Sequence, residues 1–255
     1  KNLEMHPSVA ILVACTRAAP VYHDAVHGPA LRGAVRMMVD APTPDPAVAS
    51  VAARAARAMS DGRAHVEPSF LSGERLDAAR ADMGSVLAHM VPGDGEDFQS
   101  IQTDLLNPDF RRQLPAPLPF AGLLSELDAL RAELAASTGR TLLEGGGLHL
   151  MHYPVGSKFM RHVDEDPDLF EPVRNSISFL IYLTPTDWVA EDGGALCIYD
   201  CSEDDGPRRV LPAGGTLVIY DSTVEHEVLP TRRERHLISG RYRELNDDWV
   251  RGRGS

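Results

Sequence analysis

The sequence contains few cysteines and no long apolar run. Three of its 255 residues are cysteine, at Cys15, Cys197 and Cys201. A disulfide scaffold uses many cysteines in an even number, so this set favours a reducing compartment. No run of about twenty apolar residues occurs, which argues against a transmembrane helix. The apolar stretch at 11–15 is short and lacks a basic flank, so a secretory signal is not expected.

Basic residues are also in the minority. The chain has 25 Lys plus Arg against 37 Asp plus Glu, a formal net charge of −12. An acidic surface repels a phosphate backbone, so we expect no nucleic-acid partner. Without a long apolar run, no membrane partner is expected either. The length and a hydrophobic content of 43% suit one large domain, alone or with an appendage. Together with the low cysteine content and the lack of an expected secretory signal, these features predict an intracellular protein, cytoplasmic or, in a eukaryote, nuclear.

The first half of the chain has helical patterning. Apolar residues at helical spacing follow Pro46 and end before Asp61-Gly62. A second helix is predicted to start at Ser72 as its N-cap and to run to about Leu87. A third carries a leucine stripe over 123–134 and ends at Thr138-Gly139. The intervening stretch 96–120 contains several prolines and is predicted to be irregular.

From Leu148 onward the pattern is that of short strands. Runs rich in β-branched and aromatic residues alternate with Gly, Pro and Asp turns, at 176–183, 195–199, 216–220 and 236–242. Such spacing is typical of an antiparallel sandwich or barrel. The chain is therefore predicted to have an α+β fold, with supporting N-terminal helices followed by a jelly roll.

A candidate metal site lies in this β half. In an extended segment residues two apart share a face, so His162 and Asp164 can bind one ion. His226, at the start of another predicted strand, offers a third ligand. Two imidazoles and one carboxylate leave coordination positions open, as in non-haem Fe(II) sites. A His-x-Asp pair alone is common at surfaces, but Arg235, nine residues after His226, adds a donor that suits a carboxylate.

Four segments containing these residues resemble the Fe(II)/2-oxoglutarate-dependent dioxygenases of the prolyl 4-hydroxylase type. They are MHYPVGSKFMRHVDEDPD (151–168), IYLTPTDW (181–188), GGALCIYD (193–200) and HEVLPTRRERHLISGRYR (226–243). The His-Glu-Val-x-Pro text followed by Arg235 is most similar to the oxygen-sensing prolyl hydroxylase branch. The resemblance implies a double-stranded β-helix, a cupin-like jelly roll, over about 148–243. It places this core in a dioxygenase domain at 61–255, preceded by a helical extension at 1–60.

The resemblance also implies a role for each site residue. His162, Asp164 and His226 would bind Fe(II), and Arg235 would bind the far carboxylate of 2-oxoglutarate. Tyr182, Tyr153 and Ser239 match positions that help to hold this cosubstrate. Hydroxyl groups there would offset the lost hydration of a buried carboxylate. The alternative is that the tyrosines are ordinary core residues and the serine an ordinary strand residue. No catalytic residue is predicted beyond the metal ligands.

The predicted activity is hydroxylation of an unactivated C–H bond, with O₂ as second cosubstrate, succinate and CO₂ as coproducts, and ascorbate as a candidate reductant. The resemblance favours a prolyl residue in a protein or peptide as substrate. Two alternatives stay open: hydroxylation of a free amino acid or small metabolite, and a non-catalytic cupin-like metal-binding protein. Arg235 argues against the latter, which needs no carboxylate anchor, and Asp164 argues against a halogenase. The oligomeric state is not predicted.

Overall fold

The computed structural model describes residues 45–92, 101–104, 108–114, 116, 118–165, 171–201, 206–247 and 249. The described residues all belong to one compact unit, Pro44–Ser255. The other unit, Lys1–Thr43, lies outside them, as do Cys15 and the acidic residues at 166–168. The predicted boundary between a helical extension at 1–60 and a dioxygenase domain at 61–255 stays a prediction.

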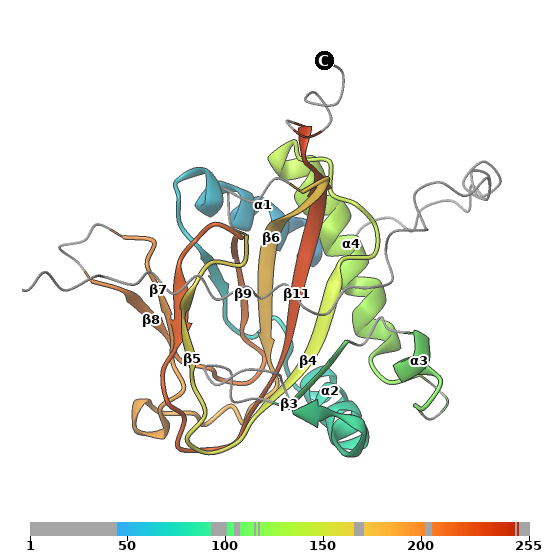
Figure 1. The fold of residues 1–255 in the computed structure, drawn as a ribbon, viewed down its shortest axis with the longest axis vertical. Coiled ribbons are helices and arrows are strands. Elements are labelled where there is room, and N and C mark those ends of the chain that lie inside the picture. The colour runs from blue at the N-terminus through green and yellow to red at the C-terminus, as the bar shows by residue number, and fades with distance from the viewer. Residues whose placement is uncertain are drawn as a thin grey trace, which may run out of the picture. The chain divides into compact units, whose positions relative to one another are not determined.

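The core of this unit consists of two antiparallel sheets (Figure 1). In the seven-stranded sheet the order is β1-β9-β6-β11-β4-β3-β2, and in the four-stranded sheet it is β5-β10-β7-β8. The larger sheet comprises β1 (His65–Glu67), β2 (Val91–Pro92), β3 (Ile101–Asp104), β4 (Gly147–Tyr153), β6 (Val173–Tyr182), β9 (Leu217–Asp221) and β11 (Arg235–Leu245). The smaller comprises β5 (Phe159–His162), β7 (Leu196–Ile198), β8 (Arg208–Val210) and β10 (His226–Val228). This confirms the predicted α+β fold with a jelly-roll core.

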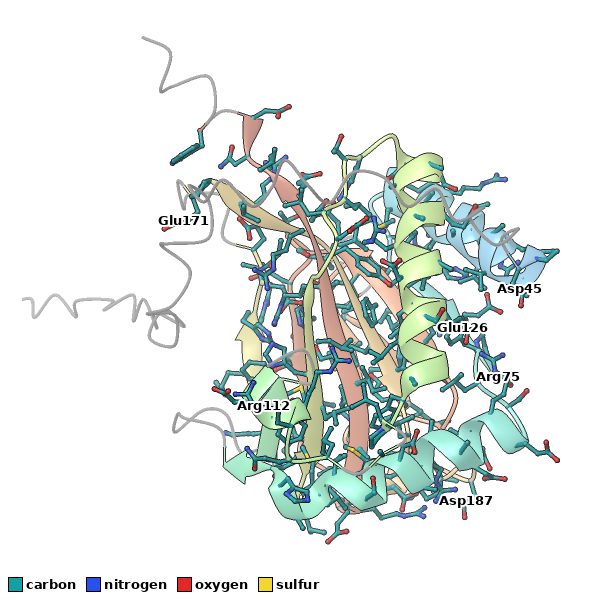
Figure 2. All side chains as sticks on the ribbon, turned by 90° about the vertical axis from the view of Figure 1, so that its right-hand side faces the viewer. Asp45, Arg75, Arg112, Glu126, Glu171 and Asp187 are labelled. Carbon is teal, nitrogen blue, oxygen red and sulfur yellow. The ribbon has the colours of Figure 1, made fainter. Side chains whose placement is uncertain are left out.

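Helices from the N-terminal half support the larger sheet. They are α1 (Pro46–Ser60), α2 (Glu74–Val86), α3 (Pro108–Arg111) and α4 (Ala121–Thr138), with a 3₁₀ turn η2 (Leu87–His89) after α2. A further 3₁₀ turn, η3 (Ala190–Asp192), lies between β6 and β7. In α1, Asp45 caps the N-terminus by accepting from the Ala47 amide at 2.9 Å. Figure 2 shows α4 along the sheet and α2 across one end of it, and Arg75 of α2 pairs with Glu126 of α4.

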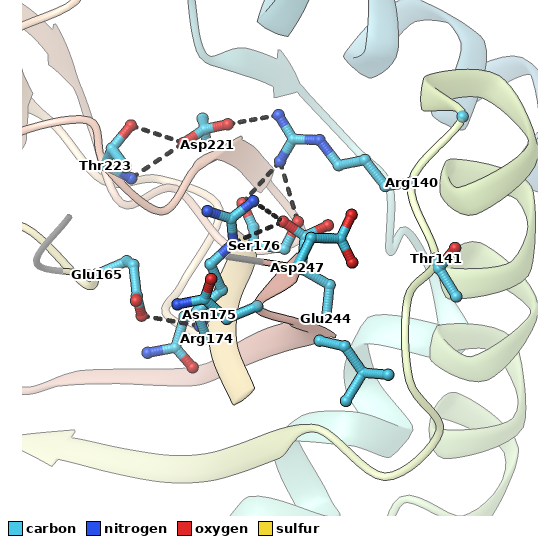
Figure 3. A pocket seen from close by; sticks show the side chains of 13 residues that line it. Arg140, Thr141, Glu165, Arg174, Asn175, Ser176, Asp221, Thr223, Glu244 and Asp247 are labelled. Carbon is cyan, nitrogen blue, oxygen red and sulfur yellow. Dashed lines mark hydrogen bonds and ion pairs between the residues drawn. The ribbon is translucent and has the colours of Figure 1, made fainter. Parts of the chain in front are cut away.

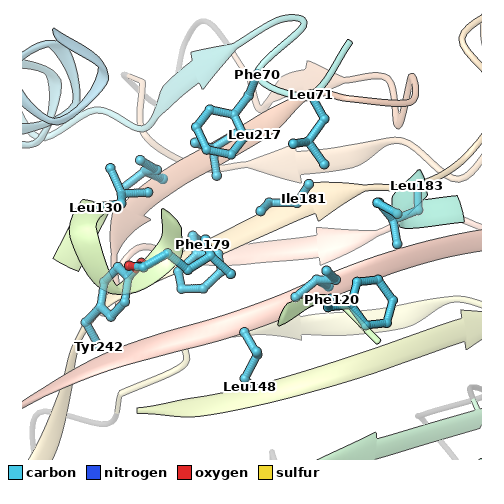
Figure 4. Close-up of a cluster of buried hydrophobic side chains, with 14 of the residues drawn as sticks. Phe70, Leu71, Phe120, Leu130, Leu148, Phe179, Ile181, Leu183, Leu217 and Tyr242 are labelled. Atoms are coloured by element: carbon cyan, nitrogen blue, oxygen red, sulfur yellow. The ribbon is translucent and has the colours of Figure 1, made fainter. Parts of the chain in front are cut away.

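Two hydrophobic clusters separate the layers. The first hydrophobic cluster joins α1, α2 and α4 to one face of the larger sheet and contains Phe179 and Ile181 of β6 (Figure 4). The second hydrophobic cluster lies between the sheets and contains Leu180 and Tyr182 of the same strand. This alternation follows from the two-residue period of a strand. Gly240 of β11 is required because a Cβ there would lie 2.0 Å from the Phe179 ring.

Two local predictions were wrong. The second helix begins at Glu74, and its N-cap is Gly73, without a side-chain cap, rather than Ser72. The stretch 96–120, predicted to be irregular, contains β3 and α3, and β3 pairs with β4. Propensity favoured a loop there, but an unpaired edge of β4 provides hydrogen bonds that a four-residue strand can use.

None of the described helices is both long enough and apolar enough to cross a bilayer. The cellular compartment stays a prediction.

Candidate metal centre and cosubstrate pocket

The three predicted metal ligands converge. Antiparallel pairing of β5 with β10 places His162 opposite His226, and Asp164 follows β5 by two residues. Asp164 Oδ1 lies 3.9 Å from His162 Nε2, and Asp164 Oδ2 lies 3.7 Å from His226 Nε2. One ligand atom from each of the three residues lies within 4.8 Å of the others. These separations fit three groups arranged around one cation.

Backbone carbonyls set the tautomer of both histidines. His162 Nδ1 lies 2.7 Å from the Met160 carbonyl, and His226 Nδ1 lies 2.9 Å from the Val224 carbonyl. A carbonyl oxygen only accepts, so each Nδ1 carries the hydrogen and each Nε2 keeps its lone pair. Outer hydrogen bonds of this kind orient histidine ligands in metal sites.

Burial keeps His162 in the neutral form that a metal requires. Desolvation, reinforced by the neighbouring His226, lowers the pKa of His162 to about 4. The imidazole is therefore uncharged at neutral pH, with its lone pair available.

Two residues that the sequence analysis missed hold the Asp164 carboxylate. Arg241 donates to Oδ1 through Nε at 3.0 Å and Nη2 at 2.5 Å. The Tyr220 hydroxyl donates to Oδ2 at 3.1 Å and lies 3.2 Å from His226 Nε2. Burial would raise the pKa of the Asp164 carboxyl, but the charge of Arg241 and its hydrogen bonds hold this pKa well below its usual range. Arg241 lies six residues after Arg235, so strand alternation was a signal for it.

The backbone of Asp164 is fixed from the neighbouring strands. The amides of Asp164 and Glu165 both donate to the Ser222 carbonyl, at 3.0 and 2.9 Å. Asn175 of β6 donates through Nδ2 to the Asp164 carbonyl, and its amide donates to Glu165 Oε2, both at 2.8 Å. Figure 3 shows Glu165 and Asn175 in the wall of a polar cavity of about 680 Å³. These bonds restrain the main chain that carries the carboxylate ligand.

Arg235 forms a second feature of the space between the sheets. Its side chain is 0% exposed, and its guanidinium lies 4.8 Å from the Tyr153 ring and 5.2 Å from the Tyr182 ring. All three guanidinium nitrogens, and the Tyr182 hydroxyl, lack a hydrogen-bond partner among the described residues. A buried cation without a partner costs several kcal/mol, on the order of 3–5. The buried Arg235 guanidinium therefore fits a carboxylate as its partner.

The remaining predicted cosubstrate residues are placed on the same face. Tyr153 pairs with Arg235 across β4 and β11, and burial raises its pKa to about 12, so its hydroxyl keeps its proton. Ser239 lies four residues after Arg235 on β11, which puts it on the inner face as well. The roles of Tyr153, Tyr182 and Ser239 stay predictions.

Comparison with known proteins agrees with this geometry. Residues 148–243 match the model of the 2OG-Fe(II) oxygenase superfamily. A crystal structure of a Pseudomonas putida prolyl-4-hydroxylase superposes with a TM-score of 0.65 at 26% identity, covering 78% of this chain and all (100%) of that one. A Trichoplax adhaerens prolyl hydroxylase, solved with a peptide of the hypoxia-inducible factor oxygen degradation domain, gives 0.65 at 16% identity over 82% of this chain and 94% of that one. This second likeness shows the fold.

A PKHD-type hydroxylase of Verminephrobacter eiseniae (strain EF01-2) is 39% identical over 88 residues, which are 34% of this chain. The match spans 35% of that relative's length. These findings confirm the predicted family and, with the His–Asp–His cluster, the predicted Fe(II) and 2-oxoglutarate. Residues 148–243 of this chain therefore match the 2OG-Fe(II) oxygenase superfamily.

Proposed function

We propose that this chain is an Fe(II)- and 2-oxoglutarate-dependent dioxygenase that hydroxylates a prolyl residue in a protein or peptide. One observation carries the oxygenase proposal. A fully buried arginine, Arg235, has no hydrogen-bond partner among the described residues and lies on the inner face that also holds a His₂-carboxylate cluster. Together they match the two ends of 2-oxoglutarate, one chelating a metal and one a free carboxylate.

The metal would be held by His162, Asp164 and His226. One ligand atom from each lies within 4.8 Å of the others, and three protein ligands would leave further positions on the ion for the cosubstrates. When bound, Fe(II) supplies O₂ activation, in which 2-oxoglutarate yields succinate and CO₂ and one oxygen atom enters a substrate C–H bond.

The protein groups around the metal position the ligands. Arg241 holds Asp164 Oδ1 with two donors, so the carboxylate cannot rotate and Oδ2 stays directed toward His226 Nε2. The two backbone carbonyls that bind Nδ1 of the histidines do the same for the imidazole rings. The site is thereby organised before a metal enters.

Cosubstrate binding falls to Arg235 and its neighbours. A guanidinium forms a bidentate pair with a carboxylate, and the low dielectric of a 0% exposed position strengthens it. The Tyr182 hydroxyl is a further donor without a partner among the described residues. Tyr153 and Ser239 complete the proposed pocket on the same face of β4 and β11.

The prolyl substrate is supported by the Pseudomonas prolyl-4-hydroxylase, whose full length is matched by 78% of this chain at 26% identity. A free amino acid or small metabolite is the alternative substrate. A non-catalytic cupin-like protein is disfavoured because it gives no reason to bury the Arg235 charge.

The first test is anaerobic. Adding Fe(II) and 2-oxoglutarate to metal-free protein is expected to produce a visible metal-to-ligand charge-transfer band that His226→Ala abolishes. A folded wild-type protein without the band would contradict the oxygenase proposal. Succinate release with proline-containing peptides, compared with free amino acids, then tests the substrate class. Turnover with free amino acids alone would contradict the prolyl proposal.

A further inference from the structure

A second group of metal-ligating side chains lies outside the site described above. It consists of His152 on β4, His236 on β11 and Glu234 just before β11. His152 Nδ1 and His236 Nε2 are 2.7 Å apart, and one ligand atom from each of the three residues lies within 4.8 Å of the others. We call these three residues the outer cluster site.

The outer cluster site is on the opposite face of the sheet from Arg235. His152 and His236 are cross-strand partners, and so are their neighbours Tyr153 and Arg235. Successive residues of a strand point to opposite faces, so inward-facing Tyr153 and Arg235 place the two histidines outward. Ile238, two residues after His236, indeed packs in the hydrophobic cluster on that outer face.

The ligand set suits a borderline divalent cation. Two imidazoles and one carboxylate form a known zinc ligand set in which water takes the fourth position. Tetrahedral zinc with bonds of about 2.05 Å separates two ligand nitrogens by about 3.3 Å. The observed 2.7 Å is therefore too short by about 0.6 Å, and small side-chain rotations provide that difference. Zinc would replace the proton that the two nitrogens now share.

The surroundings leave room for this change. Glu234 is exposed and His152 and His236 are partly exposed. A cavity of about 390 Å³ adjoins His236 and is lined by α2 residues that include Asp77 and Arg80. Their opposite charges leave the approach to the cluster without a dominant positive field.

We propose that His152, His236 and Glu234 form a second metal site that binds Zn²⁺. Bound zinc would join β4 to β11 one residue away from the Tyr153–Arg235 pair. It would thus stabilise the register of the two strands that carry the proposed cosubstrate pocket. The proposal does not depend on oxygenase activity.

Zinc stoichiometry tests it. Metal-stripped full-length protein is titrated with Zn²⁺ by calorimetry. Wild type is expected to bind two equivalents, His152→Ala/His236→Ala one, and His162→Ala/His226→Ala one. His89→Ala, at an exposed histidine of η2, is the control and is expected to keep two. One equivalent in wild type that disappears with the His162/His226 variant would overturn the outer site alone.

A milder variant guards against misfolding. Glu234 is exposed, so Glu234→Gln is expected to keep the fold while it weakens the second zinc equivalent by at least about tenfold. In the His162→Ala/His226→Ala background, Zn²⁺ should still raise the unfolding temperature, and Glu234→Gln should reduce that rise. No rise in that background would overturn the proposal. A missing first equivalent with an intact second would instead count against the proposed oxygenase centre.

Discussion

Two clusters in this molecule have the same composition, two histidines and one carboxylate, yet their surroundings differ. In the inner one, the Asp164 side chain is 5% exposed and is held by Arg241 and Tyr220. In the outer cluster site, Glu234 is exposed. The inner histidines donate through Nδ1 to backbone carbonyls, whereas His152 and His236 share a hydrogen bond with each other.

This difference shows that the groups around the ligands, more than the ligands themselves, decide how readily a site can bind a metal ion. In the inner cluster of His162, Asp164 and His226, the two Nε2 atoms and the carboxylate are held close together. Metal binding there breaks no hydrogen bond between the ligands. The outer site must lose a proton from between its nitrogens and order an exposed carboxylate. Ordering a glutamate side chain costs up to about 2 kcal/mol, so the inner cluster is expected to bind metal more tightly.

The largest effect is expected from removing the inner carboxylate. Asp164→Ala takes away one of the three proposed metal ligands and the carboxylate to which Arg241 donates, so 2-oxoglutarate turnover should fall below detection. Asp128→Ala, at an exposed carboxylate of α4, is the matched control and should retain wild-type turnover. Succinate formation measures both. Normal turnover in Asp164→Ala would remove the metal assignment and the comparison with it.

A smaller effect is expected at the proposed cosubstrate anchor, Arg235. Arg235→Ala would remove the proposed bidentate charged pair, in which each of two bonds contributes about 1.5–3 kcal/mol, so kcat/KM for 2-oxoglutarate should fall by about 10²–10⁴. Fe(II) affinity should change little, because Arg235 is not among the ligands. Arg235→Lys tests the need for the fork and should recover only part of the loss. An unchanged KM for 2-oxoglutarate in Arg235→Ala would contradict the assignment.

The next effect concerns the hydrogen bonds from Arg241 that hold Asp164 in the inner cluster, and it is measured as a change in metal affinity. Arg241→Met keeps the bulk of the side chain but removes both donors to Asp164 Oδ1, which should weaken metal binding by about 10–100-fold. Titration of metal-stripped protein with Mn²⁺, followed by its electron paramagnetic resonance signal, measures this directly. Arg233→Met, at a partly exposed arginine outside the site, is the control. Equal Mn²⁺ affinity in both variants would show that preorganisation of Asp164 does not set affinity.

Short spacings and a family resemblance account for the part of this site that the sequence predicts. His162, Asp164, His226 and Arg235 lie in a motif whose order and spacing are informative, and the strands that carry them follow from alternation. Strand alternation places Arg241 on the same face as Arg235, but its pairing with Asp164 and the His152–His236 pair depend on which strands become neighbours, a tertiary property that no local pattern contains. Ser72 was chosen as a helix cap by propensity, while the chain begins that helix after Gly73 instead.

The smallest effect compares both clusters in metal-free protein as pH falls. Burial, as the largest cause, lowers the pKa of His162 and of His236 to about 4, below the ordinary value near 6.5. The unfolded chain therefore binds more protons between these values, and the free energy of unfolding declines as pH falls through that range. From pH 7 to 6 each histidine should contribute a loss of under about 1 kcal/mol. Urea unfolding of His162→Gln and His236→Gln should show a weaker pH dependence than wild type, and an unchanged slope in both would contradict their burial in the neutral form.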